Sequence, residues 1–571
     1  MVKYRSLLLN LFICFFLMFV AGVAKFFYPS ELVWDLSNYH YYNAWALMHN
    51  RLGYDIAPAM LHTYFNPLLD IPYYFILNIW GDDAIVNFLQ GSFYGILAFI
   101  YYKITTLFFN FKKEPIAFLC TIIIGITGFA ALSQAGTSSN EVQVSLLILW
   151  GFYIILKYIH TENRKNRVWV YAGLLMGSAL GLKPTVITYC IAMGISLIVC
   201  KKTLKVSFKE IVIFAICGLL GYLIVNGWWM WQLYSHFDNP FFPFLNKIFK
   251  SEYFDFINLR DTVYVDKTTW WQKLFLPLTI SFLSLKEFYV GEVRFFDLRY
   301  ALVYLIGLFM FIRWLCRDRK LPEKKYILLY VFLVLSYLIW AYLFSIIRYS
   351  IPLGMLSAII IVKFFQKITG KTEVGNILWL SVKIIGTYIL LSEIPNYLVA
   401  LGPKMPFMSI ERINLPENAL VRVYGNPVGM VAARLVGDQS NRIVSYVNGN
   451  YVLSVNYSKN NKFTQQRSQI EQAHQGPIVS LISYNIYSQE QEVLVLALQK
   501  RRELEKQGMY CRALYNYIDV IDICVPQELK EQIFIEPERH RSFEIRGKSN
   551  KAVKDSARTY LNELNKVVNP E

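Results

Sequence analysis

The stretch LLLNLFICFFLMFVAGVA, residues Leu7–Ala24, decides the class of fold. It holds 18 consecutive residues without a charge and follows the basic residues Lys3 and Arg5. A helix that crosses a bilayer needs about 20 mostly apolar residues, whereas the apolar part of a signal peptide has about 7 to 15. We therefore predict an uncleaved first membrane-spanning helix over 6–26, with a cleaved signal peptide as the alternative.

The composition extends this interpretation to the whole chain. Of its 571 residues, 55% are hydrophobic and 17% are charged, and the mean hydropathy is +0.35. A soluble protein cannot bury so much apolar surface, so we predict a mainly α, polytopic bundle of transmembrane helices. About eleven apolar runs are candidate spans, near residues 6–26, 84–108, 115–132, 141–158, 168–182, 185–200, 209–230, 300–315, 325–345, 350–366 and 376–399. The fifth and sixth runs are short and also fit one broken helix pair.

The basic residues indicate the orientation of the chain in the membrane. A formal net charge of +17 is one signal of nucleic-acid binding, but most Lys and Arg lie in short clusters between apolar runs. Such clusters are typical of cytoplasmic loops. They fall on alternate connections, on the same side as the N terminus, and an odd number of spans puts the C terminus outside. We predict an inner (plasma) membrane protein with a cytoplasmic N terminus, a periplasmic C-terminal domain, the bilayer as partner and no nucleic acid.

The predicted domains are a transmembrane catalytic domain over 1–400, a small periplasmic α/β domain over 401–535 and a polar, basic tail over 536–571. In the α/β domain we expect strands over 419–424, 442–447 and 477–483, a helix between the first two, a helix over 489–507 and a hairpin-like pair over 510–525. Cys511 and Cys524 lie in that pair. A disulfide between them is expected if the hairpin is periplasmic.

The segment Trp34–Tyr74, directly after the first span, is rich in aromatic and titratable side chains. Leu36–Asn50 is predicted to be an amphipathic helix along the membrane interface. Asp35 precedes this helix, where it fits two compatible roles, as the N-cap and as a catalytic carboxylate close to the lipid boundary.

Further motifs follow in order along the membrane part. They are an Asn66-Pro67 turn, Asn140-Glu141 at the start of the fourth span, Gly-Leu-Lys-Pro-Thr over 181–185, a long second outer loop with DNPFFPFLN over 238–246, and Arg348-Tyr349 before another span. With Asp35, this ordered set resembles the C-type glycosyltransferase fold (GT-C), which includes oligosaccharyltransferases, protein O-mannosyltransferases and bacterial aminoarabinose transferases. The resemblance implies transfer of a sugar from a polyprenyl-phosphate carrier to a glycan, lipid or protein acceptor outside the cytoplasm.

The resemblance and the chemistry assign roles to particular residues. Asp35 is the candidate general base for the acceptor hydroxyl, and Glu141 is a second candidate acid at the site. The leaving group is a lipid phosphate, which cations stabilise. The candidate donor-binding and phosphate-binding residues are Lys183, Arg348, Arg260, Tyr349, His62 and Asn66.

Each assignment has a structural alternative. The side chain of Lys183 could simply extend from a helix end to the membrane interface. Glu141 could simply be a favourable negative charge at a helix N terminus. Histidines such as His40 and His62 are more often interfacial or packing residues than ligands.

No metal ligands are predicted, because no His or carboxylate cluster has metal-ligand spacing, although the resemblance leaves a divalent metal open. Relatives with two adjacent acids in the first loop differ from this chain, which has only Asp35 between Trp34 and Leu36. Two rival functions remain: a transporter or flippase of a lipid-linked sugar, and an O-antigen polymerase or ligase. Transporters usually contain paired halves, which this sequence lacks.

Overall fold

The contacts within the chain define two compact units, each built from three segments. The first unit comprises Met1–Ser30, Asn87–Trp228 and Asp261–Gly402, and the second comprises Glu31–Val86, Trp229–Arg260 and Pro403–Glu571. The computed structural model describes residues 2–27, 34–80, 83–160, 167–257, 259, 265, 269–282, 297–316, 322–369, 415–425, 428–437, 440–446, 461–484, 491–515 and 520–534. Each unit is therefore assembled from parts of the chain that are distant in sequence.

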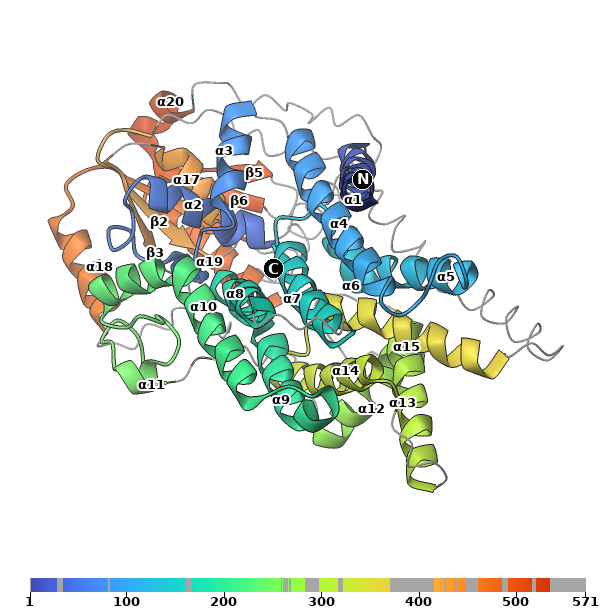
Figure 1. The fold of residues 1–571 in the computed structure, drawn as a ribbon. Coiled ribbons are helices and arrows are strands. Elements are labelled where there is room, and N and C mark those ends of the chain that lie inside the picture. Colours follow the sequence, from blue (N-terminus) through green and yellow to red (C-terminus); the bar gives the residue numbers. More distant parts are fainter. Residues whose placement is uncertain are drawn as a thin grey trace. The chain divides into compact units, whose positions relative to one another are not determined.

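The first unit is helical throughout its described residues (Figure 1). Its elements are α1 (Val2–Phe27), α4 (Asp83–Thr105), α5 (Pro115–Ile126), α6 (Phe129–Gln134), α7 (Glu141–His160), α8 (Arg167–Leu182), η3 (Pro184–Val186), α9 (Ile187–Leu204), α10 (Phe208–Phe237), α12 (Trp270–Phe282), α13 (Leu298–Cys316), α14 (Lys324–Leu343), η4 (Ile347–Ser350) and α15 (Ile351–Thr369). The sequence of α4 begins in the second unit and that of α10 ends there.

The chain is a multi-pass membrane protein. Among the described residues, eight helices are long and apolar enough to cross a membrane. Two shorter apolar helices, α5 and α8, coincide with two further predicted spans. The predicted span near 376–399 lies outside the described residues.

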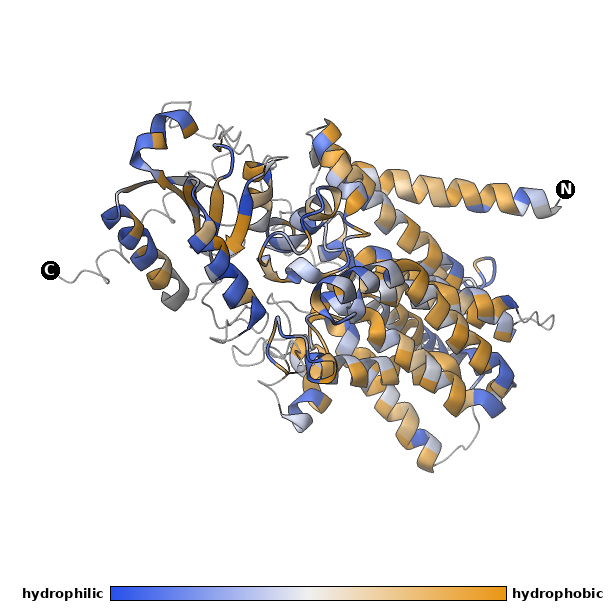
Figure 2. Ribbon diagram, turned by 90° about the vertical axis from the view of Figure 1, so that its left-hand side faces the viewer, coloured by the Kyte–Doolittle hydropathy of each residue, from blue (hydrophilic) through white to orange (hydrophobic). Residues whose placement is uncertain are grey.

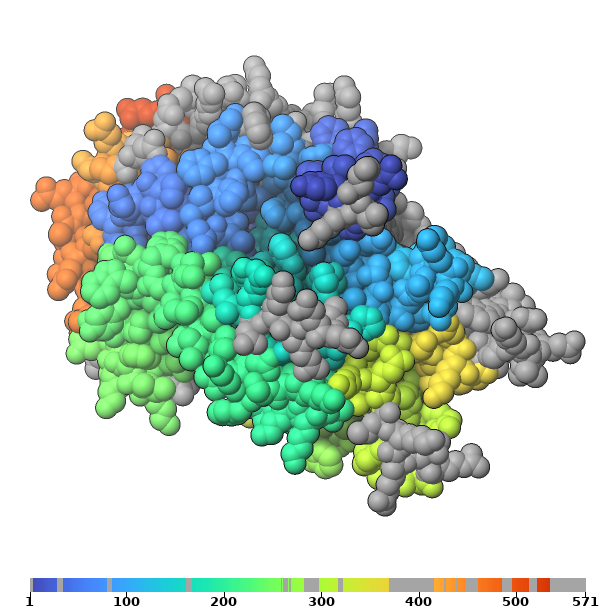
Figure 3. Space-filling view, viewed as in Figure 1, coloured from blue at the N-terminus to red at the C-terminus, as the bar shows by residue number. Residues whose placement is uncertain are grey.

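The apolar side chains of several of these helices face outward from the protein. Phe12, Phe16 and Phe19 of α1 are exposed, and Figure 2 shows that the N-terminal helix is hydrophobic along nearly its whole length. Leu219 and Ile224 of α10 are also exposed, and α10 forms part of the green surface in Figure 3. Outward apolar side chains are the pattern expected of helices that contact lipid tails.

A stripe of glycines lets α8 lie directly against α10. Gly173, Gly177 and Gly181 recur every fourth residue of α8. A Cβ atom on Gly177 would lie 1.8 Å from the carbonyl oxygen of Gly218, and one on Gly173 would lie 2.5 Å from that of Phe214. Small residues at such spacing allow the backbones of membrane helices to approach closely.

The predicted break between the fifth and sixth apolar runs is confirmed at Lys183. Helix α8 ends at Leu182, Lys183 is extended with φ −147° and ψ 115°, and η3 begins at Pro184. Proline disfavours the helical conformation in the residue before it, which explains why the helix stops there.

The second unit contains a mixed sheet covered by helices. Its elements are η1 (Leu36–His40), α2 (Tyr41–Met48), β1 (Pro58–Leu61), η2 (His62–Tyr64), α3 (Ile71–Trp80), α11 (Asn246–Phe249), β2 (Leu420–Tyr424), α17 (Gly429–Val436), β3 (Arg442–Ser445), α18 (Lys462–Ala473), β4 (Ile478–Ser483), α19 (Gln491–Lys506), β5 (Met509–Tyr515), β6 (Val520–Pro526), η6 (Gln527–Leu529) and α20 (Lys530–Ile533). In its described residues, five strands pair in the order β3-β2-β4-β6-β5. β2 is parallel to β3 and β4, whereas β6 is antiparallel to β4 and β5. The predicted small α/β domain is confirmed.

Alternate residues of the strands serve two separate cores. Leu481 of β4 joins a core with α17, η1 and α2, to which α2 contributes Tyr42 and Trp45. Ile482, the next residue of β4, joins a core with Leu498 of α19. Successive side chains of a strand point to opposite faces of the sheet, so helices cover both faces.

The helix that follows Asp35 is part of the protein interior. All residues from Leu36 to Ala46 are buried, because this helix packs against α17 and the sheet. The prediction of an amphipathic helix along the membrane interface is therefore wrong. The N-cap prediction is also wrong, because Asp35 itself has helical dihedral angles, φ −55° and ψ −41°, and its side chain makes no capping hydrogen bond.

Residues 51–56 add a further connection to the edge of the sheet. The backbone N–H of Ile56 donates to the carbonyl of Ile443 at 2.9 Å, and Ser445 N–H donates back to Ile56 at 3.0 Å. Arg51 makes two hydrogen bonds to Asp55, at 2.8 and 2.7 Å, and a third to the Asn441 carbonyl at 2.5 Å. Burial raises the pKa of the Asp55 carboxyl, and the contacts with Arg51 act in the opposite direction.

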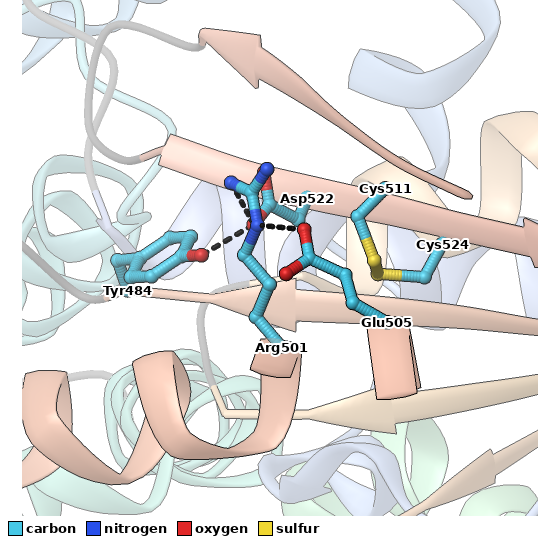
Figure 4. Close-up of a disulfide and its surroundings, with 6 residues drawn as sticks. All are labelled: Tyr484, Arg501, Glu505, Cys511, Asp522 and Cys524. Carbon is cyan, nitrogen blue, oxygen red and sulfur yellow. Dashed lines mark hydrogen bonds and ion pairs between the residues drawn. A yellow bond between two sulfur atoms is a disulfide. The ribbon is translucent and has the colours of Figure 1, made fainter. Parts of the chain in front are cut away.

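The predicted pairing of Cys511 with Cys524 is confirmed. The two residues lie opposite each other in the β5–β6 register and form a disulfide (Figure 4). Beside it, Arg501 of α19 lies 3.0 Å from Asp522, whose carboxylate also accepts a hydrogen bond from Tyr484. Burial raises the pKa of Asp522, whereas Arg501 and Tyr484 lower it.

Candidate functional site

Four of the predicted site residues lie together in the first unit: Glu141, Lys183, Arg348 and Tyr349, here called the ion cluster. Lys183 Nζ is 2.6 Å from Glu141 Oε1, and Arg348 Nε is 3.7 Å from the same oxygen. The ring centre of Tyr349 lies 5.9 Å from Lys183 Nζ and 5.3 Å from Arg348 Cζ. Lys183 also donates to the carbonyl oxygen of Ser139.

Every charged member of the ion cluster lies at the end of a helix. Glu141 is the first residue of α7, Lys183 directly follows α8, and Arg348 lies in η4 directly before α15. Charged residues at the ends of membrane-spanning helices are found where the hydrocarbon gives way to lipid head groups. This pattern predicts that the ion cluster lies at the depth of a head group.

Hydrogen bonds fix the backbone that carries Arg348 and Tyr349. The hydroxyl of Tyr189 donates to the carbonyl oxygen of Tyr349 at 2.6 Å, and Trp340 Nε1 donates to that of Ile346 at 2.8 Å. Both donors are buried. A short 3₁₀ turn has weak hydrogen bonds of its own, so these side chains hold it in place.

Within the ion cluster itself, cations outnumber carboxylates. Two cations share one carboxylate, and that carboxylate is the more deeply buried group: Glu141 is 2% exposed, against 13% for the Lys183 side chain. Its second oxygen, Oε2, has no hydrogen-bond partner among the described residues. A pair of cations in surroundings of low dielectric constant is suited to bind an anion, because both donors are charged.

Asp35 lies in the second unit, at the N-terminal end of a π-helix. Its side chain is buried. Backbone hydrogen bonds in a π-helix join residues five apart, so Asp35 and His40 lie one turn apart on the same side of the helix. In an α-helix, residues with this spacing would point in different directions. Single π-helical turns are frequent at functional sites.

His40 and Asp70 form a buried pair that the sequence interpretation did not assign. His40 Nδ1 is 2.7 Å from Asp70 Oδ1, and both side chains are almost fully buried. Nε2 has no hydrogen-bond partner within the described part of the chain. His40 lies in η1 and Asp70 in the turn before α3, 30 positions later in the sequence, so no local sequence signal relates them.

Two further predicted site residues, His62 and Asn66, have local structural contacts. The His62 ring stacks on Tyr39 with a centroid distance of 5.0 Å. Asn66 Oδ1 accepts a hydrogen bond from the Leu68 N–H at 3.0 Å, which forms the turn predicted at Asn66-Pro67. Arg260 lies outside the described residues. The roles of His62, Asn66 and Arg260 in substrate binding stay predictions.

The described residues contain no group of three or more His, Cys, Asp or Glu side chains placed to hold a metal ion. No protein-family model matches the chain, and no curated protein is significantly similar to it. The site is therefore interpreted from its own geometry.

Proposed function

We propose that this protein is a membrane glycosyltransferase that moves a sugar from a polyprenyl-phosphate carrier to an acceptor on the periplasmic side. The observation that carries the proposal is the ion cluster, in which Lys183 and Arg348 share the single carboxylate of Glu141 at helix ends. A lipid-linked phosphate has its negative charge at that depth and its hydrocarbon in the bilayer. Both properties match a cationic site in a membrane-spanning unit.

The proposed chemistry assigns separate roles to the two cations and to Asp35. When the bond between the sugar and the phosphate breaks, the phosphate gains negative charge, and Lys183 and Arg348 stabilise it. The acceptor hydroxyl loses its proton as its oxygen attacks the anomeric carbon. We assign this proton to the Asp35 carboxylate, which leaves the products as the glycosylated acceptor and the polyprenyl phosphate.

The experiment compares cells with the intact gene, without it, and with the gene encoding Lys183→Met. Glycan analysis of surface polysaccharide, lipid and protein is expected to show a sugar that is lost in the second and third strains. Purified wild-type protein is then expected to consume the matching polyprenyl-phosphate sugar. Unchanged glycans in all three strains, or a lipid-linked sugar that is only moved across the membrane, would rule the proposal out.

A matched control separates the site from general charge effects. Lys325→Met removes another lysine of the same unit, which pairs with the largely exposed Glu323 at 3.2 Å. This variant is expected to keep wild-type glycans.

A further inference from the structure

Glu141 has two possible roles, and they predict opposite effects of its removal. As a catalytic acid, it would contribute to turnover and leave phosphate binding unchanged. As a counter-ion, it would occupy the cations and compete with the donor phosphate. The contacts of each carboxylate oxygen distinguish these two roles.

The contacts favour the counter-ion. Both cations approach one oxygen of Glu141, Oε1, at 2.6 and 3.7 Å. Oε2 has no partner among the described residues, and the residue is almost fully buried. The oxygen whose contacts the structure shows, Oε1, is thus engaged by the two cations, as expected of a counter-ion.

We propose that Glu141 is an internal counter-ion, which holds Lys183 and Arg348 in position and is released from them when a lipid phosphate binds. This inference rests on the proposed function, because the same cations are assigned to the donor phosphate. Lys183 has three N–H donors. One goes to the Ser139 carbonyl and one to Glu141. We assign the Glu141 contact to the arriving phosphate oxygen, while the Ser139 contact keeps the lysine in place.

The physical reason is electrostatic. Two cations without a counter-charge are unfavourable in a membrane protein, so a built-in carboxylate stabilises the empty site. The same carboxylate repels a phosphate that approaches the cations, so it lowers the affinity for donor and product alike. A site of this kind releases the polyprenyl phosphate after transfer more readily than two unopposed cations would.

The experiment measures equilibrium binding of a radiolabelled polyprenyl monophosphate to full-length protein in detergent micelles. Glu141→Gln keeps an oxygen for Lys183 and removes the charge, and its dissociation constant is expected to fall about tenfold. Lys183→Met is expected to bind about tenfold more weakly than the wild type. The double variant, Glu141→Gln with Lys183→Met, has the same formal cluster charge as the wild type and is expected to bind about equally.

Further arms identify the ligand and control for charge. Polyprenol without phosphate is expected not to compete, and inorganic phosphate is expected to compete only weakly if the lipid contributes to binding. Glu323→Gln removes a carboxylate elsewhere in the unit, where its partner Lys325 is 3.2 Å away, and is expected to bind like the wild type.

The outcomes separate this inference from the proposed function. Weaker or unchanged binding by a folded Glu141→Gln variant, with normal wild-type binding, would overturn the counter-ion role alone. If Glu141→Gln does not fold, the double variant is compared with Lys183→Met instead. The counter-ion role predicts that the double variant binds more tightly, and equal or weaker binding would overturn that role. Wild-type binding without sugar transfer would refute the transferase and leave the counter-ion intact. No binding by either the wild type or Glu141→Gln would refute both.

Discussion

Asp35 is the residue on which the proposed chemistry depends most. It is buried beside the π-helix and does not act as an N-cap. Asp35→Asn keeps the shape of the side chain and removes its basicity, so we expect turnover to fall about a hundredfold or more while the protein stays folded. The measurement is sugar transfer by variants whose thermal unfolding matches that of the wild type. Near-normal turnover would exclude Asp35 as the base.

The Arg51–Asp55 pair makes a prediction about stability rather than activity. Asp55 is fully buried and accepts hydrogen bonds from Arg51, from the Tyr42 hydroxyl at 2.9 Å and from the Ile443 N–H at 2.8 Å. Arg51→Met leaves this carboxylate without its charged partner. We expect a loss of about 3–5 kcal/mol in the free energy of unfolding, the usual cost of breaking a buried ion pair.

An exposed ion pair of the same unit provides the control for Arg51→Met. Lys462 lies 3.0 Å from Glu252, and both side chains are exposed. Lys462→Met is expected to cost about 0–1 kcal/mol. Both variants are measured by chemical denaturation in the same detergent. If Arg51→Met and Lys462→Met lowered the free energy of unfolding equally, a structural role for Arg51–Asp55 would be contradicted.

At the scale of elements, the glycine stripe of α8 predicts how closely two membrane helices must approach. A methyl group on Gly177 would overlap the carbonyl oxygen of Gly218, 1.8 Å away. Gly177→Ala is therefore expected to lower the free energy of unfolding by about 1–3 kcal/mol, as overpacking does. Gly194 of α9 has no atom within 4 Å of its Cβ position. Gly194→Ala is expected to be neutral or stabilising by up to about 1 kcal/mol, so a loss of stability there would refute the steric explanation.

Elements with a strong local pattern were predicted closely. The strands expected over 419–424 and 477–483 are Leu420–Tyr424 and Ile478–Ser483, and the helix expected over 489–507 is Gln491–Lys506. Alternating apolar residues and turn signals are local, so they can be recognised in one sequence.

The environment of the helix after Asp35 was not predicted. Its aromatic residues fit a membrane surface and a protein core equally well. The sheet that buries them comes from residues more than 350 positions later in the chain. The ion cluster was predicted in part. Each charged residue could be recognised in the sequence at the end of an apolar run, but the sequence does not show that both cations contact the same oxygen of Glu141.

At the scale of the whole molecule, the predicted orientation in the membrane can be checked by labelling cysteines from one side. Cys316 is exposed at the end of α13, before a basic segment predicted to be cytoplasmic. Lys506, at the end of α19, is exposed in the unit that contains the disulfide. A membrane-impermeant maleimide is expected to label K506C in intact spheroplasts, and Cys316 only after permeabilisation.

The labelling experiment has two internal checks. K506C is placed in a Cys316→Ser background, so that Cys316 does not contribute to its signal. In denatured protein, Cys511 and Cys524 are expected to be alkylated only after reduction, as the disulfide requires. Labelling of Cys316 from outside intact spheroplasts would reverse the predicted orientation.

The composition of the second unit has a consequence for how a cell makes this protein. Residues 34–86 leave the ribosome about 330 residues before β2, with which they share a core. At a translation rate of about 5–20 residues per second, roughly 15 to 65 seconds pass before β2 is synthesised. During translation, their aromatic surface is available to insertases, chaperones and proteases. A premature stop before β2 would therefore yield a nascent chain that quality control can recognise by this early segment.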